Sequence, residues 1–386
     1  MMDSYRVSVE NVLRTILSFG PRALGSMAER QTADFIEHYF QKAGLEVRRQ
    51  NFSASFFPLV VAGKIITGLT LVILILAGFL FANHPLAVLV LLGLLLVQVP
   101  LVMLAVSGSK LSRIGRKFET CNLMGRTPDP DKDLPTILLV AHYDTKSQTL
   151  NMAWRVILFS VPVLAGIILF LSALLHWIGI FAMPAWGVWG MIGVAGICLV
   201  ILFFSRTENF SPGAVDNGSG VAILLSLAER LPAKITPYAN LVFLATGAEE
   251  VGLAGAIRFV KEDIQSLRQN RTLVMNFDGL GSGGTVTMAG LKQWGKFRFA
   301  ERAKMSLNEH GFRVRHYKVI PGVGLDHIPF MRAGYLAVSF TQGSVESAKR
   351  MHSPADVLEG VNIDELAKLI QAFEQMVERS AIDYGK

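Results

Sequence analysis

The sequence predicts a three-layer α/β domain that is interrupted by two transmembrane helical hairpins. Segments with strand and helix patterns alternate through most of the chain, which is typical of helices packed on both faces of a sheet. Two almost wholly apolar blocks break this alternation. The chain therefore divides into three parts of one α/β domain (1–55, 107–153 and 205–386) and two hairpins (56–106 and 154–204).

The composition also points to a membrane protein. Hydrophobic residues make up 51% of the chain, charged residues make up 17%, and the mean hydropathy of +0.42 is high for a soluble enzyme. The net charge of +7 would suit nucleic acid, but no aromatic–basic repeat or nucleic-acid motif accompanies it. Membrane proteins gather Lys and Arg beside their spans. We therefore expect a lipid bilayer as a partner and no nucleic acid.

The elements before the first hairpin have the pattern of a soluble domain. Apolar residues recur at helical spacing over 8–19, and a Gly-Pro pair ends this segment. A second helix is predicted over 31–44, where Gly44 provides a stop signal. A strand follows over 45–54. The first residues lack the basic start, apolar run and cleavage site of a signal peptide.

Each hairpin consists of two apolar segments joined by a short connector. The first hairpin contains 56–81 and 86–106, and the second contains 154–175 and 178–204. Each segment has about the 20 residues that cross a bilayer as a helix. A buried hairpin of a soluble protein is the alternative, but uninterrupted apolar runs of this length are hard to bury in one soluble core.

The distribution of charge predicts the orientation of the chain in the membrane. Neither hairpin tip carries Lys or Arg, whereas the opposite flanks carry Arg48, Arg49, Lys110, Arg113, Arg116, Lys117, Lys146, Arg155 and Arg206. By the positive-inside rule, these flanks face the cytoplasm. Both hairpins enter and leave on the same side, so the three soluble parts can assemble into one domain. We expect a multi-pass membrane protein whose α/β domain lies on the cytoplasmic side.

Strands and helices alternate again after the second hairpin. We expect strands over 241–246, 272–277, 312–319 and 335–340, and helices over 217–231, 253–260, 297–310 and 363–382. Before that hairpin, the apolar strand 136–142 ends in His142, and Asp144 follows. Residues i and i+2 of a strand point to the same side, and a carboxylate beside an imidazole is how a histidine metal ligand is oriented. A strand that meets a polar loop would give the same pattern.

Further acidic and histidine residues lie where other strands end or helices begin: Asp216, Glu249, Glu250, Asp278 and His352. Taken singly, each has an ordinary explanation. Asp216 suits a helix N-cap, and the adjacent acids Glu249 and Glu250 suit a solvated loop. Together with His142, however, the set has the content of a two-metal site, which needs a shared ligand, His and carboxylate ligands for each ion, and a base.

The order of these motifs resembles metallopeptidase family 28, which comprises co-catalytic zinc aminopeptidases with carboxypeptidase and glutaminyl-cyclase relatives. The motifs are, in chain order, H-x-D (142–144), G-A-x-D-N-x-S-G (213–220), G-A-E-E-x-G-L-x-G (247–255), N-x-D (276–278), D-H-x-P-F (326–330) and H-S-x-x-D (352–356). Apart from the hairpins, the resemblance covers 9–54 and 120–382. It implies a three-layer zinc-exopeptidase domain with a mixed central sheet.

The resemblance also implies a role for each site residue. It implies two zinc ions, with Asp216 bridging them, His142 and Asp278 completing one position, and Glu250 and His352 completing the other. Glu249 would be the general base that takes a proton from the attacking water and returns it to the leaving amine. Asp144 would orient His142. Such ligands also accept Mn²⁺ or Co²⁺. The segment 326–330 matches one that lines the site, with Leu325 where serine is frequent, and we assign it no metal role.

Our preferred interpretation is an integral-membrane zinc exopeptidase that acts on peptides as an aminopeptidase. A carboxypeptidase would need a basic pocket for the substrate carboxylate, and the sequence places no Arg or Lys there. A glutaminyl-cyclase-like acyltransferase would be expected to use one zinc ion. A catalytically silent peptide-binding scaffold in the membrane is a third alternative, although the spans lack the paired charges expected of a transport path.

The second hairpin lies between two predicted ligands, His142 and Asp216. The segments that connect these ligands to the hairpin reach no further than about 45 Å when fully extended. We therefore expect the site to open near the bilayer and to accept membrane-associated or apolar peptides.

Overall fold

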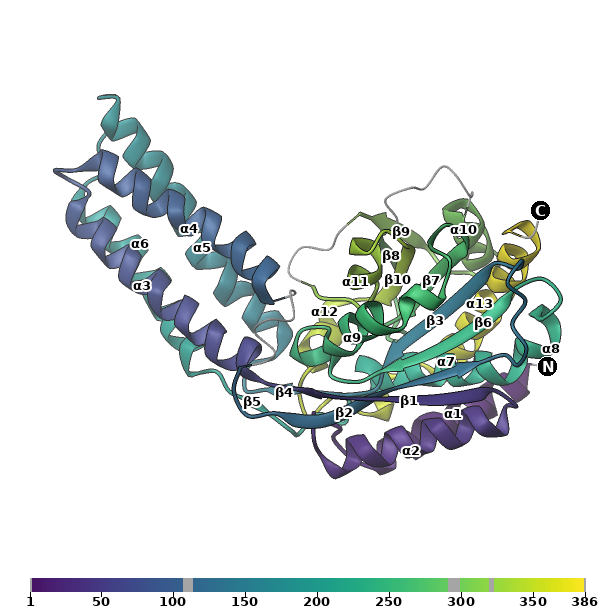
Figure 1. Cartoon of the computed structure of the whole chain (residues 1–386). Coiled ribbons are helices and arrows are strands. Elements are labelled where there is room, and N and C mark those ends of the chain that lie inside the picture. Colours follow the sequence, from purple (N-terminus) through teal and green to yellow (C-terminus); the bar gives the residue numbers. More distant parts are fainter. Residues whose placement is uncertain (1, 107–113, 291–298, 319–322, 385–386) are drawn as a thin grey trace. The chain divides into compact units, whose positions relative to one another are not determined.

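Figure 1 shows the computed structural model, which describes residues 2–106, 114–290, 299–318 and 323–384. The chain forms two compact units. The first, called the α/β unit below, comprises Met1–Ala54, Lys117–Ser147 and Glu208–Lys386. The second, called the helical unit, comprises Ser55–Arg116 and Gln148–Thr207. Lys110 and Arg113, two of the basic residues in the predicted charge bias, lie outside the described residues.

An eight-stranded sheet forms the centre of the α/β unit, with the order β1-β2-β6-β3-β7-β10-β8-β9. Its strands are β1 (Glu46–Ala54), β2 (Phe118–Arg126), β3 (Thr136–His142), β6 (Asn240–Thr246), β7 (Thr272–Phe277), β8 (Val286–Gly290), β9 (Val314–Tyr317) and β10 (Leu336–Gln342). The central strands β6, β3, β7 and β10 are parallel. β1, β2 and β8 add antiparallel pairs. The predicted mixed sheet is therefore confirmed, and its four parallel strands end at the same edge.

Helices cover both faces of this sheet, as Figure 1 shows. The helices of this unit are α1 (Met2–Ser18), α2 (Met27–Lys42), α7 (Ser219–Arg230), α8 (Pro232–Ile235), α9 (Ala254–Glu262), α10 (Phe299–Glu309), α11 (His327–Arg332), α12 (Val345–Arg350) and α13 (Ile363–Tyr384). Along β3, Ile137 and Leu139 join one buried cluster, whereas Leu138 and Val140 join another. Successive strand residues point to opposite faces, so the fully apolar sequence of β3 fits a strand that is covered on both sides.

Several short elements were not predicted from the sequence. Helices α11 and α12 have 6 residues each, too few to show a helical period. Strand β8 follows the glycine-rich segment 281–284, which reads as a loop. The helix predicted from residue 178 begins only at Ala185, since Pro184 provides its extended N-cap position. The predicted strand 312–319 is shorter than expected, and residue 319 lies outside the described residues.

The helical unit contains α3 (Gly63–Leu80), preceded by the π-helical turn Pro58–Ala62, and α4 (Pro85–Val106), α5 (Met152–Trp177) and α6 (Ala185–Phe204). Its buried side chains include Leu74, Val88, Leu169 and Ile192. Three segments are long and apolar enough to cross a membrane: Val60–Leu80, Met152–Trp177 and Ala185–Phe204. In α4 the apolar stretch among the described residues is Pro85–Leu95, so the fourth span stays a prediction. The short strands β4 (Ser147–Gln148) and β5 (Thr207–Glu208) form a separate sheet.

Candidate metal centre

The candidate site lies at the carboxyl ends of the parallel strands. His142 is the last residue of β3, Glu249 and Glu250 follow β6, and Asp278 follows β7. This edge is where open α/β sheets place their ligands. The four side chains are buried although all are polar. Buried charges need partners or metal ions, so their convergence demands a chemical explanation.

Two further side chains reach the same place from loops. Asp216 lies in an irregular turn, Ala214–Gly218, that leads into α7. It is not the N-cap of that helix, because α7 begins at Ser219 after Gly218. His352 lies in the loop after α12, with a backbone φ of 60°. The ordinary explanation of Asp216 as a cap is therefore wrong, and its carboxylate is free for another task.

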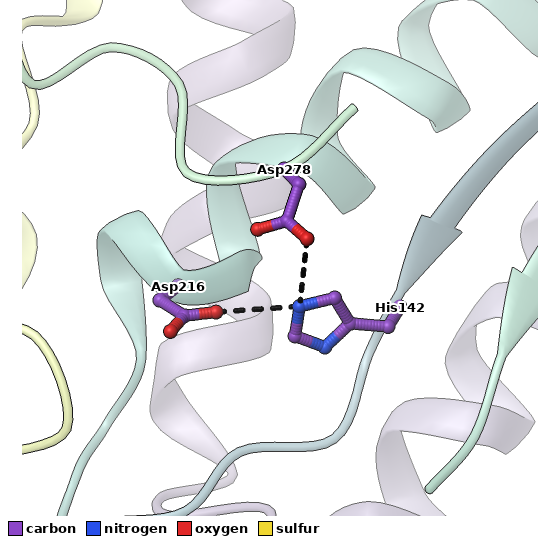
Figure 2. A group of neighbouring side chains, drawn as sticks. All are labelled: His142, Asp216 and Asp278. Carbon is purple, nitrogen blue, oxygen red and sulfur yellow. Dashed lines mark ion pairs between the residues drawn. The ribbon is translucent and has the colours of Figure 1, made fainter. Parts of the chain in front are cut away.

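The carboxylate of Asp216 is shared between two histidines. Its Oδ1 lies 3.3 Å from Nε2 of His142, and its Oδ2 lies 2.9 Å from Nε2 of His352. On one side, Asp278 Oδ2 lies 3.7 Å from the same His142 nitrogen (Figure 2). On the other side, Glu250 Oε1 lies 3.4 Å from the same His352 nitrogen. The ligand atoms form two groups, each small enough to surround one ion, and Asp216 belongs to both.

The residues present fit zinc. Each group offers one imidazole nitrogen and two carboxylate oxygens, a donor set that suits catalytic zinc with an open position. Oε1 of Glu250 is buried and has no hydrogen-bond partner among the described residues. An unpartnered buried oxygen is costly, and a metal ion at this place would satisfy it.

The electrostatics of the site favour an ionised Asp216. Burial alone would raise the pKa of this carboxyl, but hydrogen bonds with His142 and His352 bring it well below its usual value. Burial lowers the pKa of both histidines, but the surrounding carboxylates raise it overall. The site therefore concentrates negative charge, which makes it attractive to divalent cations.

Glu249 belongs to neither ligand group. Its Oε2 lies 4.0 Å from Nε2 of His142, at the limit of an ion pair. Burial raises its pKa well above the usual value, and the nearby carboxylates of Glu250 and Asp278 add to this effect. A buried carboxyl with a raised pKa beside a metal position has the properties of a general acid–base group.

Two carboxylates next to the histidines hold the backbone of the ligand loops. Asp144 accepts the amides of Glu249 and Glu250 at 3.0 and 3.1 Å. Asp356 accepts the amides of Val215 and Asp216 at 2.8 and 3.1 Å. Each carboxylate therefore orders a loop that carries site residues. The sequence suggested only that Asp144 orients a histidine, because backbone partners are invisible in a motif.

His142 is oriented mainly by the main chain. Its Nδ1 lies 3.1 Å from the carbonyl oxygen of Asp144 and 3.6 Å from the Oδ1 of the same residue. A hydrogen bond at Nδ1 leaves Nε2 free to face Asp216 and Asp278. This arrangement is the usual way in which a metal-binding histidine is fixed.

Lys146 also reaches the site, which the sequence analysis did not foresee. Its Nζ donates a hydrogen bond to Oε2 of Glu250, and its side chain is 14% exposed. The sequence signal for this contact was the position of Lys146, two residues after Asp144. The sequence analysis used Lys146 only as one of the basic residues that flank the hairpins. A lysine that contacts a predicted ligand was therefore missed.

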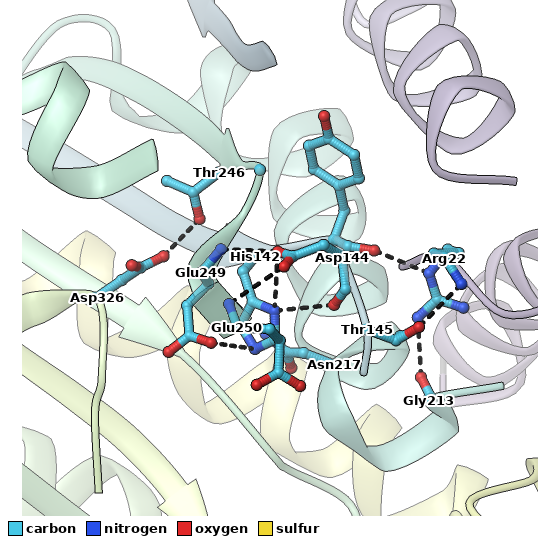
Figure 3. A network of polar contacts seen from close by, with 12 residues as sticks. Arg22, His142, Asp144, Thr145, Gly213, Asn217, Thr246, Glu249, Glu250 and Asp326 are labelled. Atoms are coloured by element: carbon cyan, nitrogen blue, oxygen red, sulfur yellow. Dashed lines mark hydrogen bonds and ion pairs between the residues drawn. The ribbon is translucent and has the colours of Figure 1, made fainter. Parts of the chain in front are cut away.

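Arg22 ties together the two loops that carry His142 and Asp216 (Figure 3). The guanidinium is fully buried and donates to the carbonyls of Tyr143, Pro212 and Gly213 at 2.8, 2.6 and 3.0 Å. The long insertion of the helical unit separates these loops in sequence. Arg22 therefore joins the chain where it leaves the α/β unit to the chain where it returns.

Gly213 shows why the segment before Asp216 needs glycine. Its φ of +63° is left-handed, and an added Cβ would lie 2.2 Å from a methyl carbon of Thr145 and 2.5 Å from the carbonyl oxygen of Asp216. A larger residue would displace the turn that presents this carboxylate.

The segment with Asp326 and His327 lies beside the site, as the motif suggested. Asp326 accepts a hydrogen bond from Thr246, and burial raises its pKa to about 7. Nδ1 of His327 lies 2.7 Å from Oγ of Ser339, and burial lowers the pKa of His327 to about 4. Among the described residues, neither one belongs to a group that could hold a metal ion.

Comparison with known proteins agrees with this geometry. The family model described as "Peptidase family M28" matches residues 193–377. Aminopeptidase YwaD of Bacillus subtilis is 28% identical over 167 residues, which cover 41% of this chain and 35% of YwaD. The chain is therefore similar to peptidases of family M28 over this region. A probable zinc metalloprotease of Pyrenophora tritici-repentis is 28% identical over 192 residues, covering 41% of this chain and 43% of the relative. The chain therefore spans less than half of these curated relatives.

Solved structures of this type share the fold. The zinc aminopeptidase BSAP from Bacillus subtilis has a TM-score of 0.58 at 16% identity, covering 99% of this chain and 97% of that one. A glutaminyl cyclase from an Acidobacteriales bacterium has a TM-score of 0.56 at 14% identity, covering 97% and 94%. At such identities the likeness shows the mixed α/β fold of a zinc aminopeptidase and leaves the reaction open.

Proposed function

We propose that this M28-like protein is an integral-membrane, di-zinc exopeptidase that removes N-terminal residues from peptides. The observation that carries the proposal is the Asp216 carboxylate, whose two oxygens face His142 and His352 separately. A shared carboxylate between two complete ligand groups is the arrangement that a two-metal hydrolase requires. His142 and Asp278 would hold one zinc ion, and Glu250 and His352 the other.

When bound, the two ions polarise the scissile carbonyl and lower the pKa of the attacking water. Glu249 accepts a proton from that water as the new C–O bond forms. It then gives the proton to the amine nitrogen as the C–N bond breaks, so the carboxylate is regenerated. Asp144 holds the backbone of Glu249 in place throughout. The products are a free amino acid and a shortened peptide.

Membrane integration forms part of the proposal. Three helical segments have the length and hydropathy of spans. Large apolar side chains point outward from them, such as Phe79, Trp186 and Ile197, which are 71%, 80% and 64% exposed. Exposed apolar surface of this extent suits lipid and not water. From the four apolar segments we infer four spans, and from the charge bias we infer a cytoplasmic α/β unit. Accessibility labelling of single cysteines from each side of the membrane would test both inferences.

A glutaminyl-cyclase-type acyl transfer is the second candidate, because the fold is shared with a solved glutaminyl cyclase. The presence of ligands for both ions favours hydrolysis over this reaction. Carboxypeptidase action would need a free cation for the substrate carboxylate. Among the described residues, Lys146 and Arg22 are cations near the site; Lys146 is already paired with Glu250, and Arg22 already donates to three backbone carbonyls.

The decisive assay compares a free-amine peptide with its N-acetylated twin, using detergent-purified protein. We expect stepwise removal of N-terminal residues from the free-amine peptide alone. Glu249→Gln should abolish this activity, whereas Glu309→Gln, at a surface pair with Arg379, should leave it unchanged. Equal trimming of the acetylated twin would refute an aminopeptidase. Cyclisation of an N-terminal glutamine without hydrolysis would favour the second candidate.

A further inference from the structure

Lys146 gives one of the two candidate metal positions its own cation. Its ammonium donates to Oε2 of Glu250 and also lies close enough to Glu249 and Asp216 to be attracted by them. In the part of the chain that the structure describes, Asp278 at the other position has no ion pair with Lys or Arg. The two positions therefore differ in charge although their ligand types are the same.

The hydrogen bond from Lys146 makes the two carboxylate oxygens of Glu250 different from each other. Oε2 is occupied by the hydrogen bond from Lys146. Oε1 is buried, has no hydrogen-bond partner among the described residues, and lies 3.4 Å from Nε2 of His352. Only one oxygen is therefore left for a metal ion, and binding through both oxygens would break the ion pair.

We propose that Lys146 is an internal competitor for the metal position formed by Asp216, Glu250 and His352. It satisfies Glu250 in the metal-free protein and keeps the zinc affinity of this position below the value that the ligands alone would give. The inference rests on the proposed zinc function, but it concerns metal binding and not peptide hydrolysis.

Two effects of Lys146 act in opposite directions. A hydrogen bond to a metal-binding carboxylate orients it, which normally strengthens binding. A buried ammonium repels a divalent cation, and this repulsion grows with the product of the charges and is weakly screened away from water. Removal of the lysine would also leave Glu250 buried and uncompensated, which favours any incoming cation. The ligands are already ordered by Asp144 and Asp356, so the charge effect dominates.

The test is a zinc titration of metal-free, detergent-purified protein against a chromophoric chelator. In Lys146→Met, we expect one of two zinc equivalents to bind about ten- to a hundredfold more tightly, while the other equivalent keeps its affinity. Lys146→Arg retains the cation and should behave like the wild type. Lys234→Met is the matched control, because this lysine pairs with Glu374 and Glu378 away from the ligand groups.

A second readout is the melting temperature of the metal-free protein. Lys146→Met should melt at a lower temperature than the wild type without zinc and gain more from zinc. If this variant fails to fold, Lys146→Gln takes its place, because an amide can still donate to Oε2 without a charge, and it should also tighten binding. Unchanged or weaker zinc binding in these variants would overturn the proposal. A wild type that binds no zinc would overturn both this inference and the proposed function. Tighter binding in a protein that cuts no peptide would refute the function alone.

Discussion

Asp356 accepts the backbone amide of Asp216, with its Oδ2 3.1 Å from the amide nitrogen. Asp144 does the same for the amide of Glu250, with its Oδ2 3.1 Å from that nitrogen. Each of these carboxylates follows a histidine of the site within a few residues of sequence. The loop after His352 therefore holds the loop that carries Asp216, and the loop after His142 holds the one that carries Glu250. The candidate ligands are positioned by these connected loops.

Asp356→Asn should lower both zinc affinity and activity. Asparagine can accept only one of the two amides and would turn an N–H toward the other donor, leaving a buried amide without a partner. We expect zinc affinity and kcat/KM to fall by about ten- to a hundredfold, as for other groups that orient metal ligands. Chelator competition and peptide assays measure the two quantities. Asp364→Asn, at an exposed pair with Arg6, is the control, and equal effects of both changes would contradict the assigned role.

Arg22→Lys should destabilise the α/β unit, although the substitution keeps the positive charge. An ammonium cannot reach the three carbonyls that the buried guanidinium satisfies, and an incompletely paired buried charge costs about 3–5 kcal/mol. The free energy of unfolding, measured by chemical denaturation, should fall by this amount, and bound zinc should fall with it. Arg379→Lys, which alters a surface pair with Glu309, should change the stability little. Retention of full stability in Arg22→Lys would show that the guanidinium does not hold these loops.

His327 should make the protein less stable as the pH falls. Burial lowers its pKa from 6.5 to about 4 in the folded state. Below pH 6.5 the unfolded chain therefore binds a proton that the folded chain does not, so stability is lost as the pH drops from 6.5 towards 4. The loss is about 2 kcal/mol at pH 5 relative to pH 7. His327→Asn should remove this component from the pH profile of the free energy of unfolding. Parallel profiles for both proteins would show that this histidine is not the titrating group.

The sequence could locate the candidate ligands His142 and Asp278 because each follows or ends an apolar strand that it predicts. A short segment such as Thr136–His142 predicts both the apolar strand β3 and the histidine at its end. Contacts between distant segments leave no such local sign. Arg22 lies before the first hairpin, whereas the carbonyls that it binds lie between the hairpins, at Tyr143, and after the second, at Pro212 and Gly213. Lys146 looked like one more basic flanking residue. The N-cap explanation of Asp216 failed for a related reason, because the motif does not show that α7 begins only at Ser219, after Gly218.

The number of zinc ions per chain tests the central claim most directly. Elemental analysis of dialysed, detergent-purified protein should give two zinc ions per wild-type chain. Asp278→Ala and His352→Ala should each retain one, because each removes a ligand from a single position. Asp216→Ala should lose both, because its carboxylate belongs to both ligand groups. Two zinc ions in Asp216→Ala, or loss of both in Asp278→Ala, would contradict a shared carboxylate between two metal positions.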